Sequence, residues 1–536
     1  MDKTSISRSE WKWVIWVSLA IVLGTMVPYA IGYAFAGPGY RFIGFMHNGD
    51  DMCVYLSWMR QAADGNFFIR NLFTTEPQIG KGFNIFFYVL GKLAHFAHLP
   101  LAAMLHIVRV ISGFALLLAI YILSSIWIEN KSSRRLCLLI TGTSAGLGFL
   151  FVGVPHSTNA PVDLWQPEAI TFLSIYLSPL YTFPTLLMVG IIFWLYKFAT
   201  IGQWKHAIFA GVGLLLLSNI HTYDIIPLGL TWAFYSLLKL ALKPRNSRVL
   251  VGGATALLIA SPAIAYQAYF FLSEPVFRMR AAVPTTSPSI VWYITGYGLL
   301  LVFALIGVWQ SRRNNDLNLL VCWCLAGFIA AYLPVTFQRK LIMGTHIPLS
   351  ILATMGVTAV TSRILKDKYR TLFSALILLA MVPSNMVVIA WNIGDILQNQ
   401  VPTAFHTPYI SEVELNALSF LRAHAKPDEA ILGPPSFSVL VPGFTGRTVY
   451  CGHWGETVRF WDKLLEVGRF YVPDTSDDER RTFLRKHRIS WVVECREESS
   501  PGFKPVNLSE RKVDYLKPAF DQGGIVIYRV VDDGKV

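Results

Sequence analysis

Charged residues are scarce in this chain of 536 residues. Aspartate, glutamate, lysine and arginine together make up 15% of it, against roughly 25% in soluble domains. Hydrophobic residues make up 54%, and the mean hydropathy is +0.46. A composition this apolar excludes an ordinary soluble protein and predicts an integral membrane protein.

The net charge of +13 does not by itself indicate nucleic-acid binding. Lysine and arginine occur in short tracts between apolar segments and form no basic stripe interleaved with aromatic residues. Such tracts are typical of residues that set the orientation of membrane helices. We therefore expect membrane lipids as partners and no nucleic acid.

Cysteine is also scarce, and the six residues lack the spacing of a metal site. Cys322 and Cys324 lie inside an apolar segment, where thiols behave as small hydrophobic groups. Cys451 and Cys495 share the predicted C-terminal domain, and the sequence leaves open whether they pair.

Apolar runs long enough to cross a bilayer core of about 30 Å recur along the chain. Helices are the economical way to satisfy the backbone in lipid, so the runs predict about eleven transmembrane helices. The predicted spans are 13–35, 101–128, 136–154, 181–200, 207–220, 225–242, 249–272, 291–310, 317–335, 346–365 and 372–393.

The basic tracts predict the orientation of these spans, because lysine and arginine favour the cytoplasmic side. If the helices simply alternate, the tracts fall on one side, which puts the N-terminus inside and the C-terminus outside. Counting residues 83–99 as a span would move every later tract outside. We therefore expect a helix there at the outer surface, with Lys92 reaching toward water. The tracts contain Lys3, Arg8, Lys12, Lys131, Arg134, Arg135, Lys205, Lys243, Arg245, Arg248, Arg312, Arg313, Arg363, Lys366, Lys368 and Arg370.

Two domains are predicted. Residues 1–393 form a transmembrane domain whose first outer loop, 36–100, carries juxtamembrane helices. Residues 405–536 have the composition of a small extracytoplasmic α/β domain. Within it, charge and hydrophobic patterns predict helices over 412–424 and 477–487, and strands over 430–433, 489–494 and 524–531.

The segment "HNGDDMCVY" places two adjacent carboxylates, Asp50 and Asp51, just after the first span. Neighbouring carboxylates repel each other unless a cation, a proton or hydrogen-bond donors compensate. One interpretation is that one of the pair is a catalytic base; the other is that Asp50 only caps a helix beginning near Asp51.

Several other ionisable residues fall on the same outer side of the predicted topology. The motif "FQRK" breaks the charge rule that predicts the orientation, and an anionic lipid headgroup would account for its two cations. Simple snorkelling to lipid is the alternative for that motif, and a buried structural pair is the alternative for Arg109. The candidates are Arg109, Asp163, Glu168, His221, Asp224, Arg278, Arg280, Arg339 and Lys340.

Carboxylates facing cations at a membrane surface suggest a reaction of a lipid phosphate with a group that loses a proton. Glycosyl transfer from a polyprenyl-phosphate sugar fits this description. Asp50 or Asp51 would accept the proton of an acceptor hydroxyl. Arg339 and Lys340, with Arg109, would bind the donor phosphate. If a divalent cation such as Mg²⁺ or Mn²⁺ takes part, Asp51, Glu168 and His221 are the residues expected to hold it.

The chain resembles the GT-C superfamily of membrane glycosyltransferases, in the company of protein O-mannosyltransferases and lipid A aminoarabinose transferases. The similar features are the acidic pair in "GDD", the arginine in "LHIVRVISG", the basic outer motif "FQRK" and a C-terminal outer domain. The resemblance implies a lipid-linked monosaccharide donor, an inverting displacement and a first-loop acidic residue as base, in a bacterial inner membrane. The chain has "KGFNIFFYVLGKLA" where those branches carry a His-Pro-Pro-Leu stretch, so the acceptor stays open.

Two other classes of function are alternatives. A transporter or lipid flippase would carry ionisable residues near the middle of its spans and internal symmetry, whereas here the mid-span positions are nearly uncharged. A receptor or assembly factor would use the outer domain for binding only.

The predicted topology can be tested with a reporter enzyme fused after Trp391. We expect activity only when the reporter is of a type that works outside the cytoplasm. Activity of a cytoplasm-specific reporter at the same position would overturn the orientation.

Overall fold

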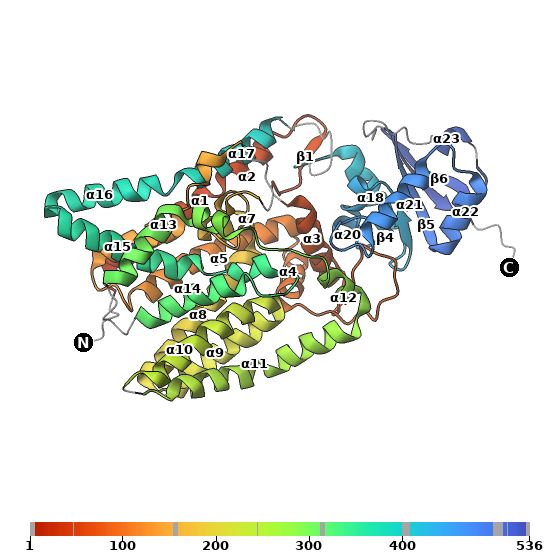
Figure 1. The fold of residues 1–536 in the computed structure, drawn as a ribbon. Helices are drawn as coiled ribbons and strands as arrows, with labels where there is room; N and C mark the ends of the chain where they lie inside the picture. The colour runs from red at the N-terminus through yellow and green to blue at the C-terminus, as the bar shows by residue number, and fades with distance from the viewer. Residues whose placement is uncertain are drawn as a thin grey trace. The chain divides into compact units, whose positions relative to one another are not determined.

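The computed structural model describes residues 6–46, 48–153, 159–243, 245–310, 317–398, 408–496, 508–511 and 513–531 (Figure 1). His47, the basic residues Lys3, Arg312 and Arg313, and the predicted start of the C-terminal domain at 405 lie outside them. The chain divides into two compact units. Unit 1 comprises Met1–Pro28, Leu105–Tyr269 and Pro284–Asn392, and unit 2 comprises Tyr29–Met104, Phe270–Val283 and Ile393–Val536.

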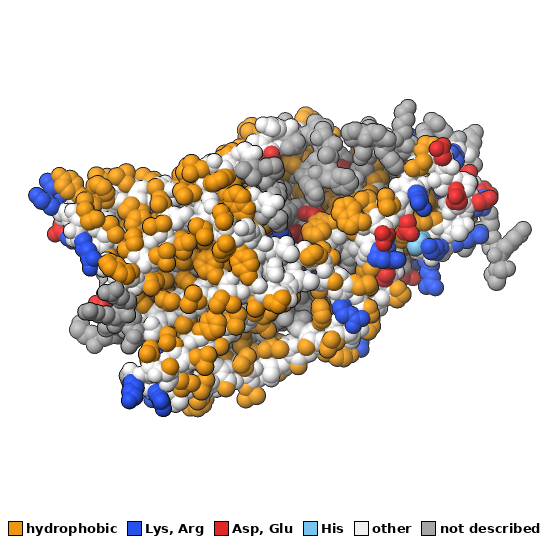
Figure 2. Space-filling view, in the orientation of Figure 1, with side chains coloured by type: hydrophobic (Ala, Val, Ile, Leu, Met, Phe, Trp, Pro, Cys, Tyr) orange, Lys and Arg blue, Asp and Glu red, His pale blue; other side chains and the backbone are white. Residues whose placement is uncertain are grey.

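Unit 1 is built from long apolar helices joined by short 3₁₀ turns. Figure 2 shows mostly hydrophobic side chains over the visible face of these helices. Leu258 and Leu305 are among the large hydrophobic side chains of unit 1 that are exposed. Surfaces of this kind face lipid rather than water. The helices that lie wholly or mostly in unit 1 are α1 (Arg8–Gly24), α5 (Leu101–Ser124), α6 (Lys131–Thr143), α7 (Thr171–Leu177), α8 (Pro179–Ile201), α9 (Trp204–Ile220), α10 (Ile225–Ala241), α11 (Arg248–Ser273), α13 (Ile290–Gln310), α14 (Asn318–Ala330), α15 (His346–Ile364), α16 (Asp367–Ala380) and α17 (Pro383–Gln398), with 3₁₀ turns η1 (Gly148–Phe151), η2 (Val162–Leu164), η3 (Thr222–Asp224) and η5 (Gln338–Ile342).

Small residues let two of these helices approach closely. A Cβ atom added at Gly356 of α15 would lie 1.9 Å from the Phe303 carbonyl oxygen of α13, and one at Gly307 would lie 2.1 Å from that of Leu352. Glycine is therefore required on both sides of this contact, as is common between helices in membranes.

Within the described residues, six helices are long and apolar enough to cross a membrane. The bent pair α16 and α17, with 43° between its halves, would make a seventh. Most of the remaining predicted spans correspond to shorter helices, such as α9 with 17 residues and α14 with 13. An integral membrane protein is thus confirmed, and the number of eleven spans stays a prediction.

The predicted span 136–154 is wrong in its bounds. Helix α6 begins at Lys131 and ends at Thr143, and a 3₁₀ turn follows. The backbone N–H groups of Gly146 and Gly148 donate to Asp163 Oδ2 at 2.9 and 3.0 Å. Because these two N–H groups donate to the buried carboxylate, they do not make the backbone hydrogen bonds that would continue the helix.

The C-terminal part of unit 2 is an α/β fold around a five-stranded sheet in the order β4-β3-β5-β7-β6. Strands β4, β3 and β5 are parallel, and β5, β7 and β6 are antiparallel. The strands are β3 (Ala430–Leu432), β4 (Thr448–Val449), β5 (Ile489–Cys495), β6 (Leu516–Gln522) and β7 (Ile525–Val530), and the helices are α18 (Glu412–His424), α19 (Pro435–Ser438), α20 (Val441–Thr445), α21 (Phe460–Tyr471), α22 (Asp477–Lys486) and α23 (Leu508–Arg511).

The first outer loop folds together with this sheet domain. Strand β1 (Tyr40–Phe42) pairs antiparallel with β2 (Tyr409–Ser411), and the Val449 amide donates to the Leu72 carbonyl at 2.9 Å. Unit 2 also contains α2 (Val27–Ala34) from Tyr29 onward, α3 (Gly49–Ala63), α4 (Ile85–Phe96) and α12 (Pro275–Ala281). The helix expected at 83–99 is α4. Its 12 residues extend about 18 Å, too short to cross a bilayer.

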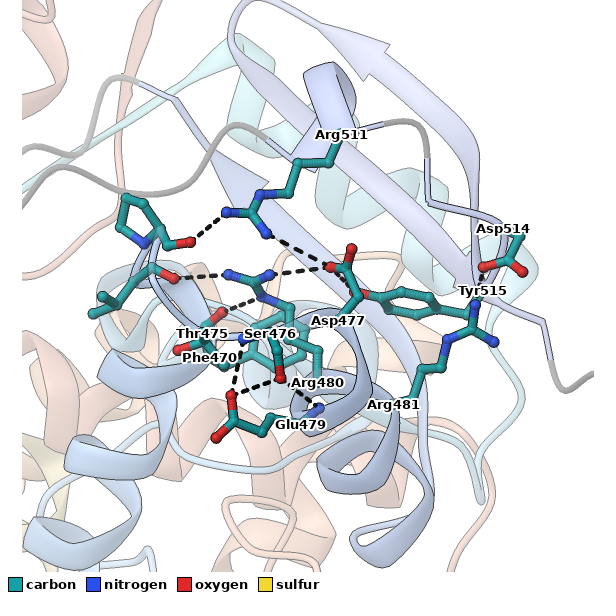
Figure 3. A network of polar contacts seen from close by, with 12 residues as sticks. Phe470, Thr475, Ser476, Asp477, Glu479, Arg480, Arg481, Arg511, Asp514 and Tyr515 are labelled. Atoms are coloured by element: carbon teal, nitrogen blue, oxygen red, sulfur yellow. Dashed lines mark hydrogen bonds and ion pairs between the residues drawn. The ribbon is translucent and has the colours of Figure 1, made fainter.

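A buried arginine holds the α21–α22 junction of the sheet domain (Figure 3). The Arg480 side chain is fully buried and donates to the carbonyls of Phe470 and Val472 at 2.9 and 2.7 Å. It also donates to Asp477 Oδ1 at 3.1 Å, and Tyr515 O–H donates to the same oxygen. One guanidinium thus satisfies the carbonyls that end α21 and begin the next turn.

All six cysteines lie in the described part of the chain and have free thiols. Cys451 and Cys495, whose pairing the sequence left open, are both buried, and no disulfide joins them.

The Arg480 network predicts a loss of stability. In Arg480→Ala two carbonyls lose their donor, and each buried acceptor left unsatisfied costs about 1–3 kcal/mol. We expect the full chain in detergent to lose at least about 2 kcal/mol in the stability of this domain, measured by denaturant-dependent proteolysis. Arg481→Ala is the control, since it removes an ion pair to the exposed Asp514, worth about 0–1 kcal/mol, and a contact with the Tyr515 ring, but leaves the carbonyls of Phe470 and Val472 with their donor. Equal losses in both variants would contradict the assignment.

Candidate functional site

The acidic pair lies in the first turn of α3. This helix begins at Gly49, and its N-cap is Asn48, which has φ 49° and makes no side-chain cap hydrogen bond. The alternative that Asp50 is merely the cap is therefore wrong, because Asn48 tolerates the left-handed conformation and occupies that position. Asp50 and Asp51 instead lie where the positive end of the helix dipole favours carboxylates.

A histidine from the sheet domain faces both carboxylates. His453 Nε2 lies 3.3 Å from Asp51 Oδ1 and 3.6 Å from Asp50 Oδ2, and the ring is 3% exposed. Its Nδ1 accepts the amides of Gly455 and Glu456 at 3.0 and 3.2 Å. Since Nδ1 is an acceptor, the ring proton is on Nε2 and points at the acidic pair.

The charge state of His453 depends on these neighbours. Burial lowers the pKa of His453, but the hydrogen bond and charge of Asp51, with the charges of Glu456 and Asp50, raise it above the ordinary value. The two amides on Nδ1 oppose a second proton. In either protonation state Nε2 carries a proton and is the ring nitrogen nearest the acidic pair.

Two further side chains complete the surroundings of the pair. Trp454 Nε1 donates to Asp50 Oδ2 at 3.0 Å, and its indole stacks on the His453 ring with 5.8 Å between centroids. Glu456, which follows on the same turn, forms an ion pair with Arg280 of α12. The Arg280 guanidinium lies 5.2 Å from the Trp58 ring centroid.

The structure therefore brings Asp50, Asp51 and Arg280 into one cluster of unit 2. Arg278, predicted to bind substrate with Arg280, is exposed on the same short helix. His453 and Trp454 were not predicted to contact the acidic pair, and the only signal for them was a His-Trp-Gly-Glu turn rich in polar and aromatic residues.

A second cluster lies in unit 1, on η3 and η5. His221 Nδ1 lies 2.6 Å from Asp224 Oδ2, and the Tyr223 hydroxyl lies 2.6 Å from His221 Nε2. Lys340 Nζ is 5.2 Å from the Tyr223 ring centroid. His221 and Asp224 are buried. The sequence predicted three of these residues but missed Tyr223, although it stands inside the "HTYD" motif.

Arg339 lies beside this cluster on η5. Its guanidinium lies 5.3 Å from the Trp165 ring centroid, and its carbonyl accepts Gln166 Nε2 at 2.8 Å. Within the described residues its buried Nε has no hydrogen-bond partner. Glu168 is 7% exposed, and no ion pair to another described residue is present.

Arg109 has internal partners. Its guanidinium is 1% exposed and donates to Thr25 Oγ1 at 3.0 Å and to the Ile175 carbonyl at 2.8 Å. A third contact joins it to Met26 Sδ at 2.7 Å. These contacts favour the structural alternative over binding of the donor phosphate.

No metal site is apparent in residues 6–531 outside the undescribed gaps: no three His, Cys, Asp or Glu side chains there are grouped to hold an ion. Of the predicted set, Asp51 belongs to unit 2, while Glu168 and His221 belong to unit 1. The use of a divalent cation stays a prediction, as does the meeting of the acidic pair with Arg339 and Lys340.

No protein-family model and no characterised protein matches the chain by sequence. Solved structures match its fold. ArnT from Cupriavidus metallidurans bound to undecaprenyl phosphate is 12% identical with a TM-score of 0.52, over 97% of this chain and 98% of ArnT. The archaeal oligosaccharyltransferase AglB from Archaeoglobus fulgidus, in complex with an inhibitory peptide and a dolichol-phosphate, is 12% identical with a TM-score of 0.55, over 92% and 70%.

A third similar structure is the arabinofuranosyltransferase AftD from Mycobacteria. It is 14% identical with a TM-score of 0.56, over all of this chain and 42% of AftD. All three are membrane glycosyltransferases of the GT-C superfamily. The resemblance predicted from the sequence is thus confirmed at the level of architecture, and the chain is an integral membrane protein with the GT-C fold.

Proposed function

We propose that this protein is a glycosyltransferase that moves a monosaccharide from a polyprenyl-phosphate donor to an acceptor hydroxyl on the outer face of the cytoplasmic membrane. The GT-C fold supports the class of reaction. ArnT and AglB were each solved with a polyprenyl-type phosphate bound, which supports a lipid-linked donor. The basic tracts support an outer location for the loops that carry both clusters.

The acidic pair of α3 is the observation that carries the proposal. Among the described residues Asp50 forms no ion pair with a lysine or arginine; Trp454 donates a hydrogen bond to it, and His453 Nε2 lies 3.6 Å from it. The Trp454 hydrogen bond holds this carboxylate in place, and the proposal gives it the part of accepting the proton of the acceptor hydroxyl. A structural ion pair would instead present a cation at this position.

The donor phosphate is assigned to η5. Lys340 and Arg339 supply two positive charges, and the unpartnered Nε of Arg339 is a hydrogen-bond donor ready for an anionic oxygen. Tyr223 adds a hydroxyl held against His221 and, through it, Asp224.

The chemical step is a single displacement. The acceptor oxygen attacks the anomeric carbon from the face opposite the phosphate, and its proton passes to one carboxylate of the acidic pair. The bond from the anomeric carbon to the phosphate oxygen breaks, and its electron pair stays on the polyprenyl phosphate. The product is inverted at that carbon. Base assistance of this kind contributes about 10² to 10⁴ in rate.

The base assignment predicts the effect of removing each carboxylate. We expect Asp50→Asn and Asp51→Asn each to lower transfer from polyprenyl-phosphate sugars by at least about 100-fold in purified protein. One carboxylate is the base, and the other holds or aligns it. Asp462→Asn, at an exposed position of α21, is the control and should retain activity. Wild-type protein that neither transfers nor hydrolyses any such sugar would contradict the proposed function, as would a fully active double variant.

The phosphate assignment predicts a role for the Tyr223 hydroxyl. Tyr223→Phe keeps the ring under Lys340 and removes one donor. Because charge on the phosphate grows in the transition state, we expect kcat to fall about 10- to 100-fold with little change in KM for the donor. In Tyr332→Phe, the matched control, the lost hydroxyl donated only to the Pro288 carbonyl. Indistinguishable kinetics in the two variants would refute the role of Tyr223.

A further inference from the structure

Unit 2 contains a cavity of about 260 Å³ on the side of α3 away from the acidic pair, at the C-terminal ends of α3 and α4. Arg60 and Asp64 from the end of α3 line it, together with His95 of α4 and Arg422 of α18. Leu101, the first residue of α5, forms part of the wall. None of these residues has a part in the proposed glycosyl transfer.

The charges in this cavity are unbalanced. Arg422 donates to both oxygens of Asp64, at 2.8 and 3.2 Å, so the one carboxylate of the cavity is already engaged. The Arg60 Nε has a long contact of 3.4 Å with the Gly443 carbonyl, and no ion pair of Arg60 with a described carboxylate is present. Burial and the nearby charge of Arg422 lower the pKa of Arg60. Two guanidinium groups with one carboxylate leave a net positive site, and an anion would relieve their repulsion.

The helix beside the cavity has an exposed apolar edge. Val89, Leu93 and Phe96 are 42%, 49% and 74% exposed and follow the i, i+4, i+7 spacing of one helix stripe. Lys92 lies on the same helix, its Nζ 5.8 Å from the Tyr88 ring centroid. A short helix with an apolar stripe beside basic and aromatic side chains is typical of the membrane interface.

The residues that line the cavity also place it at the membrane interface, because one of them begins a membrane-spanning helix. Helix α5 is long and apolar enough to cross the bilayer, and the cavity wall includes its first residue. The cavity therefore lies where this span enters lipid. That is the depth at which lipid phosphates are found.

We propose that the cavity formed by Arg60, Asp64, His95 and Arg422 binds the phosphate headgroup of an acidic membrane phospholipid. The phosphate accepts hydrogen bonds from Arg60 and from the imidazole of His95, and the acyl chains run along the Val89–Leu93–Phe96 stripe of α4. Arg422 is held back from the phosphate by Asp64 and adds only its charge. The bound lipid thereby anchors the first outer loop to the membrane surface.

The test uses the full chain purified in detergent and titrated with phosphatidylglycerol or phosphatidylcholine, with bound lipid counted by native mass spectrometry. We expect wild-type protein to prefer phosphatidylglycerol and Arg60→Gln to bind it about ten-fold more weakly, the loss of about one charge-assisted hydrogen bond. Arg60→Lys keeps the charge and should retain most of the binding. Arg41→Gln is the control, because Arg41 is an exposed arginine of the same unit paired with Glu412. Unchanged thermal unfolding identifies variants that are folded.

Each other outcome overturns the proposal. Equal affinity of Arg60→Gln and Arg41→Gln for phosphatidylglycerol would show that the cavity is not the site. Equal affinity of the wild type for both lipids would remove the role of net charge. Protection against unfolding by inorganic phosphate alone, as strong as that by the lipid, would assign the cavity to free phosphate. A lipid-free dimer broken by Arg60→Gln would make a second copy of the chain the occupant.

Discussion

Unit 2 contains two adjacent carboxylates, Asp50 and Asp51, whose mutual repulsion must be offset by the groups around them. Asp50 and Asp51 project from the first turn of one helix. The dipole of α3 offsets part of the cost. The rest of the electrostatic cost is offset by a His-Trp turn of the C-terminal domain. Its Trp454 lies 404 residues after Asp50 in the chain and donates a hydrogen bond to it. The contacts of the acidic pair thus join residues 36–100 to the C-terminal domain, as the pairing of β1 with β2 also does.

The arginines fall into two groups, those with a structural role and those proposed to bind a ligand, and they differ in their partners within the protein. Arg109 and Arg480 are almost fully buried, and hydrogen bonds to neighbouring protein atoms hold their guanidinium groups in place. Arg280 is tied to Glu456 and stabilises the turn that presents His453. Arg339 and Arg60 differ from these because no described carboxylate pairs with either. An arginine held in place without a counter-charge is a site for an anion from outside the protein.

Much of the architecture was predictable because it rests on local patterns. The helix predicted over 412–424 has those bounds in the structure, and three predicted strands are found within one or two residues. Strand β6 was missed because it is a polar edge strand with Pro518 and little alternation. Helix α21 was missed since Trp461 and Leu465 are exposed and obscure its apolar face. The span over 136–154 failed because a distant carboxylate, Asp163, captures the amides that would have continued it.

The sequence by itself determined the membrane class of the protein and the positions of α18, α22, β3, β5 and β7 along the chain. These follow from hydropathy, charge and short-range spacing, which are properties of contiguous residues. Tertiary structure decided which residues compensate the acidic pair, that Asn48 and not Asp50 caps α3, and that Arg109 faces inward. The contacts of the acidic pair and of Arg109 join residues that lie 66 to 404 positions apart, and no local pattern records them.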